Sequence, residues 1–186
     1  MPELVQQLVE NTKDVSLRPF APELVICATI VLMLLVRLFD SLRWLHAFYI
    51  ALIGTTAALV LAALPALRGL PVERIEIFTG MLVFDSFSVF VRSFLLAFGV
   101  LFLLFTKLSG VPRNADATDF YALFLGSTLG MCLMASANHM LTVFLAVEMA
   151  SVPSYVLAGI LRQQRSSEAA LKYAVYGAGA AGVMVY

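Results

Sequence analysis

The chain has 186 residues, of which 61% are hydrophobic and 13% are charged, and its mean hydropathy is +0.94. A soluble domain of this length is far less apolar, so the composition predicts a polytopic protein of the lipid bilayer. The formal net charge is zero, and the basic residues stand singly or in pairs between apolar runs. Because no basic patch is present, we exclude nucleic-acid binding.

Five apolar runs are long enough to span a bilayer, and a sixth reaches the last residue of the sequence. They follow an N-terminal polar segment of residues 1–19 and lie near Pro22–Leu38, Leu45–Leu67, Met81–Thr106, Phe120–Ala137, Met140–Leu161 and Glu168–Tyr186. No run shows the period-two alternation of a barrel strand. The predicted fold class is therefore all-α, a polytopic bundle of about six transmembrane helices.

The lysine and arginine residues favour an N-terminus outside the membrane. In that orientation the inward loops hold Arg37, Arg43, Lys107, Arg113, Arg162 and Arg165, and the outward segments hold Lys13, Arg18, Arg68 and Arg74. This excess of inward basic residues agrees with the usual bias of membrane proteins. The turn around Asn138 and His139 has no Lys or Arg, which fits an outward turn.

Glu148 lies inside the fifth run, roughly 12 Å from its start at about 1.5 Å per residue. A carboxylate is costly in hydrocarbon, and acids at this depth are rare and usually functional. Pro153 has no N–H to donate to the Met149 carbonyl, which predicts a broken, hydratable helix beside the acid. We interpret Glu148 as part of a proton or ion pathway. The alternative is a protonated glutamate that only joins two helices.

Lys172 lies in the sixth run, one helical turn after Glu168, and we expect Ser166 to cap this helix. In one interpretation Lys172 pairs with Glu168 near the interface, which contributes only about a few tenths of a kcal/mol. In the other it is buried, loses its proton easily and responds to a carboxylate on an adjacent helix. We favour the second interpretation and predict a charge pair between Glu148 and Lys172 in a proton relay.

Asp85, Ser88 and Arg92 fall at i, i+3 and i+7 in the third run, on one face of a helix. Such a face must meet protein or water rather than lipid. Arg92 could instead snorkel if the span starts near Phe87. We interpret Asp85, Arg92 and Glu168 as structural polar residues, and a place for them in the pathway stays open.

The sequence shows no motif for a cofactor or a metal ion. One glycine set spells the dinucleotide fingerprint GxGxxG, but it lies in a helix-like run with no preceding strand, so close helix packing explains it better. The same explanation applies to a GxxxG pair in the fourth run. These glycines are Gly177, Gly179 and Gly182 in the first set and Gly126 and Gly130 in the second. Cys27 and Cys132 lie in separate runs without metal-site spacing.

The segment from Phe124 to Gly182 resembles the antiporter-like membrane-arm subunits of NADH:quinone oxidoreductase (complex I), the subunit N family. The match is most specific in VEMASVPSYVLAG and SSEAALKY, and Asp85 in FDSFSVF is similar to an acid at the head of the family's third helix. The resemblance covers at least Phe84 to Tyr186. By position, Glu148 matches the family's fifth-helix glutamate and Lys172 its sixth-helix lysine.

The resemblance implies a proton-translocating subunit without a cofactor, in the bacterial inner membrane or an equivalent energy-coupling membrane. NADH and quinone would bind other subunits, and the other membrane-arm subunits would be its partners. It also implies three leading helices in residues 20–110 and the first three helices of an antiporter-like repeat in residues 111–186. The last helical run ends at Tyr186 without a C-cap, which adds the expectation that the chain is a fragment of a longer subunit. Two alternatives stay open: a subunit of a multisubunit cation/proton antiporter, and a membrane scaffold without transport.

Overall fold

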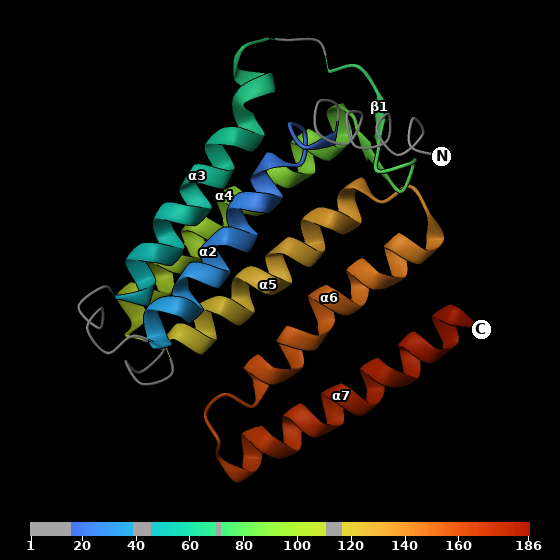
Figure 1. Ribbon diagram of the computed structural model, residues 1–186. Coiled ribbons are helices and arrows are strands. Elements are labelled where there is room, and N and C mark those ends of the chain that lie inside the picture. Colours follow the sequence, from blue (N-terminus) through green and yellow to red (C-terminus); the bar gives the residue numbers. More distant parts are fainter. Residues whose placement is uncertain (1–15, 39–45, 70–71, 111–116) are drawn as a thin grey trace.

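The computed structural model describes residues 16–38, 46–69, 72–110 and 117–186. In these ranges the chain forms six α-helices and one two-stranded sheet. They are α2 (Ala21–Leu38), α3 (Ala47–Leu67), β1 (Ile75–Ile77), β2 (Leu82–Phe84), α4 (Ser86–Ser109), α5 (Ala117–Ser136), α6 (Met140–Ala158) and α7 (Gln164–Val185). Consecutive helices run in opposite directions, and α6 and α7 lie in turn beside the group α2–α5 (Figure 1). The predicted all-α bundle is confirmed.

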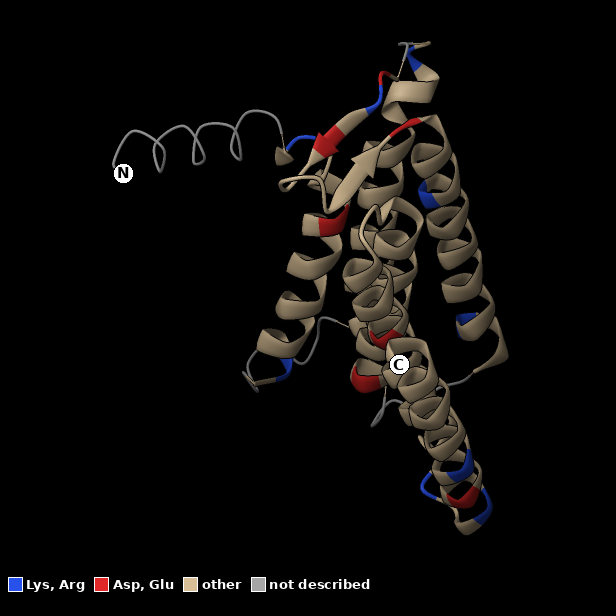
Figure 2. Ribbon diagram, turned by 90° about the vertical axis from the view of Figure 1, so that its right-hand side faces the viewer, with Lys and Arg blue, Asp and Glu red and all other residues tan. Residues whose placement is uncertain are grey.

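Five helices in the described part, α2 to α6, are long and apolar enough to cross a membrane. Most of the charged residues lie towards the ends of the helices or in the sheet (Figure 2). Helix α7 carries Arg165, Glu168 and Lys172 in its first half and is not among the five spans. Of the predicted polar segment and loop charges, residues 1–15, Arg43 and Arg113 lie outside the described residues.

The third apolar run departs from its prediction, because the expected helix from Met81 begins only at Ser86. Residues Leu82–Phe84 instead pair antiparallel with Ile75–Ile77, joined by a turn in which Gly80 has φ +82°. Asp85 fixes the helix start, since its carboxylate accepts a hydrogen bond from Ser88 N at 2.7 Å. The Ser88 hydroxyl accepts one from Asp85 N at 3.0 Å, which completes a capping box.

The start of α7 also differs from the prediction. The helix begins at Gln164, and Ser166 is its third residue rather than its cap. The Ser166 hydroxyl accepts a hydrogen bond from the Gln163 N–H at 3.2 Å. A serine at this position satisfies a backbone donor that the first turn leaves free, so the helix can start three residues earlier. Glu168 consequently lies in the second turn.

The hydrophobic core lies among α2, α3, α4 and α5. On α4 the buried residues Val89, Leu96 and Leu103 recur every seven positions, which is one face of a helix. Leu125 and Leu129 of α5 meet this face within the same core. In contrast, α6 buries only Ala146, and α7 buries no residue in the described chain. The division at residue 110 stays a prediction, since α5 shares its core with the helices before that point.

The sheet joins two turns at one end of the bundle. Asn138, between α5 and α6, donates from its backbone N–H to the Met81 carbonyl at 2.9 Å and from its side chain to the Gly80 carbonyl at 3.0 Å. Phe78 N donates to the Ser16 hydroxyl at 3.4 Å. Ser16, the sheet and the Asn138 turn therefore lie at the same end. The side of the membrane that this end faces stays a prediction.

Candidate functional site

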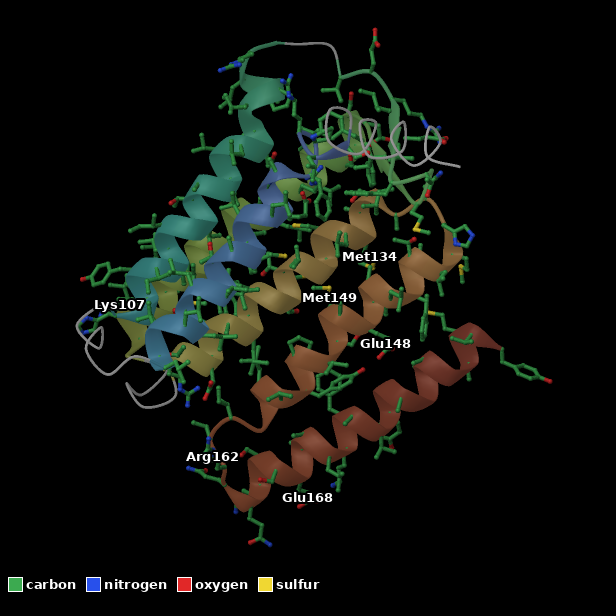
Figure 3. All side chains as sticks on the ribbon, in the orientation of Figure 1. Lys107, Met134, Glu148, Met149, Arg162 and Glu168 are labelled. Atoms are coloured by element: carbon green, nitrogen blue, oxygen red, sulfur yellow. The ribbon has the colours of Figure 1, made fainter. Side chains whose placement is uncertain are left out.

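Glu148 is the ninth of the 19 residues of α6 and is half-buried. Ala146 precedes Glu148 by two residues and Ala150 follows it by two. Both contact the backbone of α5 at Gly130. Two residues of helix correspond to about 200° of rotation, so Glu148 projects from the face of α6 that points away from α5. Figure 3 shows its side chain on the side of α6 where α7 lies. Within the described residues, the Glu148 carboxylate makes no hydrogen bond and no ion pair.

The opposite face of α6 is fixed tightly on α5. A Cβ added at Gly130 would lie 2.5 Å from Ala150 N and 2.8 Å from the Met149 carbonyl carbon, so only glycine permits this approach. The Ser127 hydroxyl of α5 donates to the Ala150 carbonyl at 2.9 Å. The close packing predicted from the GxxxG pair is therefore present at Gly130. It holds the turn that carries Glu148 in a defined place.

Pro153 lies inside α6, which continues past it to Ala158. The helix is thus not ended by the proline, but one backbone hydrogen bond is missing, because proline has no N–H for the carbonyl of Met149. That carbonyl immediately follows Glu148 in the chain. A free backbone acceptor beside a carboxylate is suited to holding a water molecule between the two. The role of Pro153 in the pathway stays a prediction.

Lys172 lies on α7, about 12 Å from the first residue of that helix. Its ammonium donates to the Glu168 carboxylate at 2.6 Å, and the two side chains are 67% and 61% exposed. This is the arrangement of the first interpretation given above for Lys172. The charge pair expected between Glu148 and Lys172 is not formed in this structure. The i,i+4 spacing explains the difference, since it brings Glu168 within reach without any tertiary contact.

The polar face predicted on α4 divides into two parts. Asp85 and Ser88 form the capping box, whereas Arg92 lies in the interior and forms an ion pair with Glu23 of α2. The Arg92 and Glu23 side chains are only 3% and 2% exposed. Arg92 also donates to the Pro19 carbonyl at 2.9 Å. These contacts join α2 and α4, and the structural role expected for Arg92 stays a prediction.

Glu23 is the residue that the sequence analysis missed. It lies in the first turn of α2, where it could be taken for an acid of the membrane surface. The available signal was a pair of opposite charges. One acid lies early in the first run and one arginine early in the third, and neither has a partner nearby in the sequence. Elsewhere in the described residues, no three His, Cys, Asp or Glu side chains gather in a group that could hold a metal ion.

Known proteins are similar to this chain in sequence. The family model described as NADH:quinone oxidoreductase/Mrp antiporter, transmembrane region, matches residues 137–186, which include Glu148 and Lys172. NADH-quinone oxidoreductase subunit N 2 of Sorangium cellulosum is 38% identical over 184 residues, covering 92% of this chain and 35% of the relative. Subunit N of Neisseria gonorrhoeae is 33% identical over 180 residues, covering 95% of this chain and 36% of that protein.

This chain belongs to the subunit N family of antiporter-like complex I membrane subunits. A solved structure agrees: a chain of the respiratory complex I of Thermus thermophilus with bound aureothin has a TM-score of 0.67 and 26% sequence identity. That match covers 87% of this chain and 34% of the Thermus chain. The chain thus spans about a third of the length of its subunit N relatives. The relatives that match it are subunits of NADH-quinone oxidoreductases.

Proposed function

We propose that this chain is part of a proton-translocating membrane-arm subunit of a respiratory NADH:quinone oxidoreductase, in which Glu148 takes up and releases a proton. The position of Glu148 carries the proposal. It is central in an apolar helix, it faces away from α5 towards α7, and no described side chain neutralises it. A buried acid that only joined two helices would need a hydrogen-bond partner, and Glu148 has none in the described residues.

The chemistry of the site follows from its surroundings. An apolar environment favours a neutral carboxyl group, whereas a nearby cation favours the carboxylate. Approach of positive charge can therefore release a proton from Glu148, and withdrawal of that charge can load one. Lys172 is the proposed partner or next station. Its pair with Glu168 is exposed and weak, so exchanging that partner costs little.

The proposed setting follows from the relatives. Quinone reduction elsewhere in the complex would supply the energy, and the other membrane-arm subunits would be the partners of this chain. NADH and quinone would bind those other subunits, and this chain would hold no cofactor. The membrane is the bacterial inner membrane or an equivalent energy-coupling membrane. A second candidate is a subunit of a cation/proton antiporter, because the matching family model covers both groups.

The test substitutes Glu148→Gln in the complete protein within its complex, reconstituted in liposomes. The amide keeps size and hydrogen bonding but cannot ionise, so assembly should survive while proton pumping and coupled quinone reduction fall, by up to about 100-fold. Glu148→Asp should be intermediate, because its charge is withdrawn by one methylene. Glu73→Gln, at an exposed glutamate before β1, is the matched control and should pump normally.

Two results would reject the proposal. One is wild-type pumping by Glu148→Gln together with an assembly defect confined to Glu148→Ala, which would make the glutamate structural. The other is equal activity of the Asp and Gln variants, which would show that charge is not used. Redox subunits that purify with the chain separate the oxidoreductase from the antiporter, since the antiporter has none.

A further inference from the structure

Helices α6 and α7 meet through an aromatic contact. The Tyr155 and Tyr173 rings lie edge to face with centroids 4.6 Å apart and planes at 73°. A hydrogen bond of 3.3 Å joins the Tyr173 hydroxyl to the Ser154 hydroxyl. Such a contact has a preferred geometry, unlike the contact between two aliphatic side chains.

Gly177 completes a notch for the Tyr155 ring. Tyr173 and Gly177 are one turn apart on α7, so they share a face of that helix. A Cβ added at Gly177 would lie 1.9 Å from the Tyr155 hydroxyl and 2.3 Å from Cζ, so the Tyr155 side chain would have to move. The ring therefore occupies the space that the missing side chain leaves. At Gly179 and Gly182 a Cβ would meet no described atom within 4 Å, so the expected close packing is seen only at Gly177.

The notch lies on the two helices that carry the proposed relay residues. Tyr155 follows Glu148 by seven residues, two turns along the same face of α6. Tyr173 follows Lys172 directly in the chain. In the described chain α7 buries no residue and packs against α6. The two helices also approach each other at the end of α6, where a Cβ on Gly159 would lie 3.0 Å from Ala170 Cβ of α7.

We infer that Tyr155, Tyr173 and Gly177 are positioning residues of the relay: the notch sets the spacing of α6 and α7 and so the separation of Lys172 from Glu148. This inference rests on the proposed function of those two residues. The tyrosines themselves carry no proton in it. They act by holding the two helices at one distance, on which the probability of proton exchange across the gap depends.

The test is Gly177→Ala in the complete protein within its complex, with Gly179→Ala and Gly182→Ala as matched controls. The added methyl at residue 177 must displace the Tyr155 ring, whereas the same methyl at the control positions meets no described atom within 4 Å. We expect Gly177→Ala to lower the number of protons pumped per quinone reduced by at least twofold and to shift the pH profile of pumping, while the controls keep wild-type values. Tyr173→Phe, which removes one hydroxyl, should give a smaller change in the same direction.

Combination with Glu148→Gln separates positioning from simple stability. If the notch acts through Glu148, Gly177→Ala should add no further loss of pumping in that background. The inference is overturned if Gly177→Ala matches the controls, or if it reduces only the amount of complex while the assembled fraction pumps with the wild-type ratio and pH profile. Those outcomes leave the Glu148→Gln result untouched. Failure of Glu148→Gln to affect pumping would instead reject the proposed function itself.

Discussion

Two acid–base pairs in this chain show how its two regions differ. In the group α2–α5, Arg92 and Glu23 are 69 positions apart and almost completely buried. In α6–α7, Lys172 and Glu168 are four positions apart and more than half exposed. The first pair depends on the tertiary fold and contributes to it, whereas the second forms from helix geometry alone. The first region thus holds a buried, paired charge, whereas in the second region Glu148 has no partner among the described residues.

The largest expected effect comes from breaking the buried pair. Arg92→Met leaves the Glu23 carboxylate in the apolar core without a partner, which should cost about 3–5 kcal/mol. The double variant Arg92→Met with Glu23→Gln removes both charges and should recover most of the loss. Thermal denaturation of the detergent-solubilised complex measures both.

A matched control exists at the opposite end of α2. Arg37 pairs with Asp119 of α5, and the side chains are 51% and 33% exposed. Arg37→Met should therefore cost only about 0–1 kcal/mol. If Arg37→Met and Arg92→Met lowered stability equally, the buried and exposed pairs would not differ in energy. That result would contradict the comparison.

The next effect concerns the joint between the two regions. Gly130→Ala places a methyl group 2.5 Å from Ala150 N and must push α6 away from α5. Overpacking of this kind costs about 1–3 kcal/mol. Gly182→Ala, the same change at a position on α7 where a Cβ meets no described atom within 4 Å, should leave the denaturation temperature unchanged. A harmless Gly130→Ala would mean that α6 is loosely held, contrary to the contact described.

A smaller loss should follow from Asp85→Ala at the start of α4. The substitution removes the carboxylate that accepts from Ser88 N, and loss of an N-terminal cap costs about 1 kcal/mol. Asp85→Asn retains an acceptor oxygen and should lie close to wild type in the same denaturation assay. If Asp85→Asn impaired pumping while stability stayed normal, Asp85 would belong to the pathway rather than to the cap.

The smallest effect on stability is expected at the exposed pair. Glu168→Gln removes an i,i+4 interaction that contributes about 0.2–0.5 kcal/mol. The denaturation temperature should hardly change, and the difference from wild type should disappear at high salt, where exposed charges are screened. A loss as large as that of Arg92→Met would show that Glu168 is enclosed by other parts of the complex.

Sequence alone predicted the helices because apolar length is a strong signal in membrane proteins, and it predicted Gly130 because close helix contacts need small residues. It could not place β1 and β2, since strands of three residues are too short for a reliable period. It missed Glu23 because nothing local connects this residue to Arg92. For Lys172 it favoured Glu148 on another helix as the partner. Glu168 is four residues away on the same helix, so helix geometry alone brings it within reach. Local patterns thus gave the helices, but not the short strands or the pairings between distant residues.

The protonation state of Glu148 during turnover tests the central claim most directly. Infrared difference spectra of the complex can be recorded as quinone reduction begins, with Glu148→Gln and Glu73→Gln as the variants. A relay glutamate should give a carboxylic C=O band that appears or disappears on turnover, is absent in Glu148→Gln and persists in Glu73→Gln. Identical carboxyl bands in wild type and Glu148→Gln would show that Glu148 does not change protonation and would contradict the account.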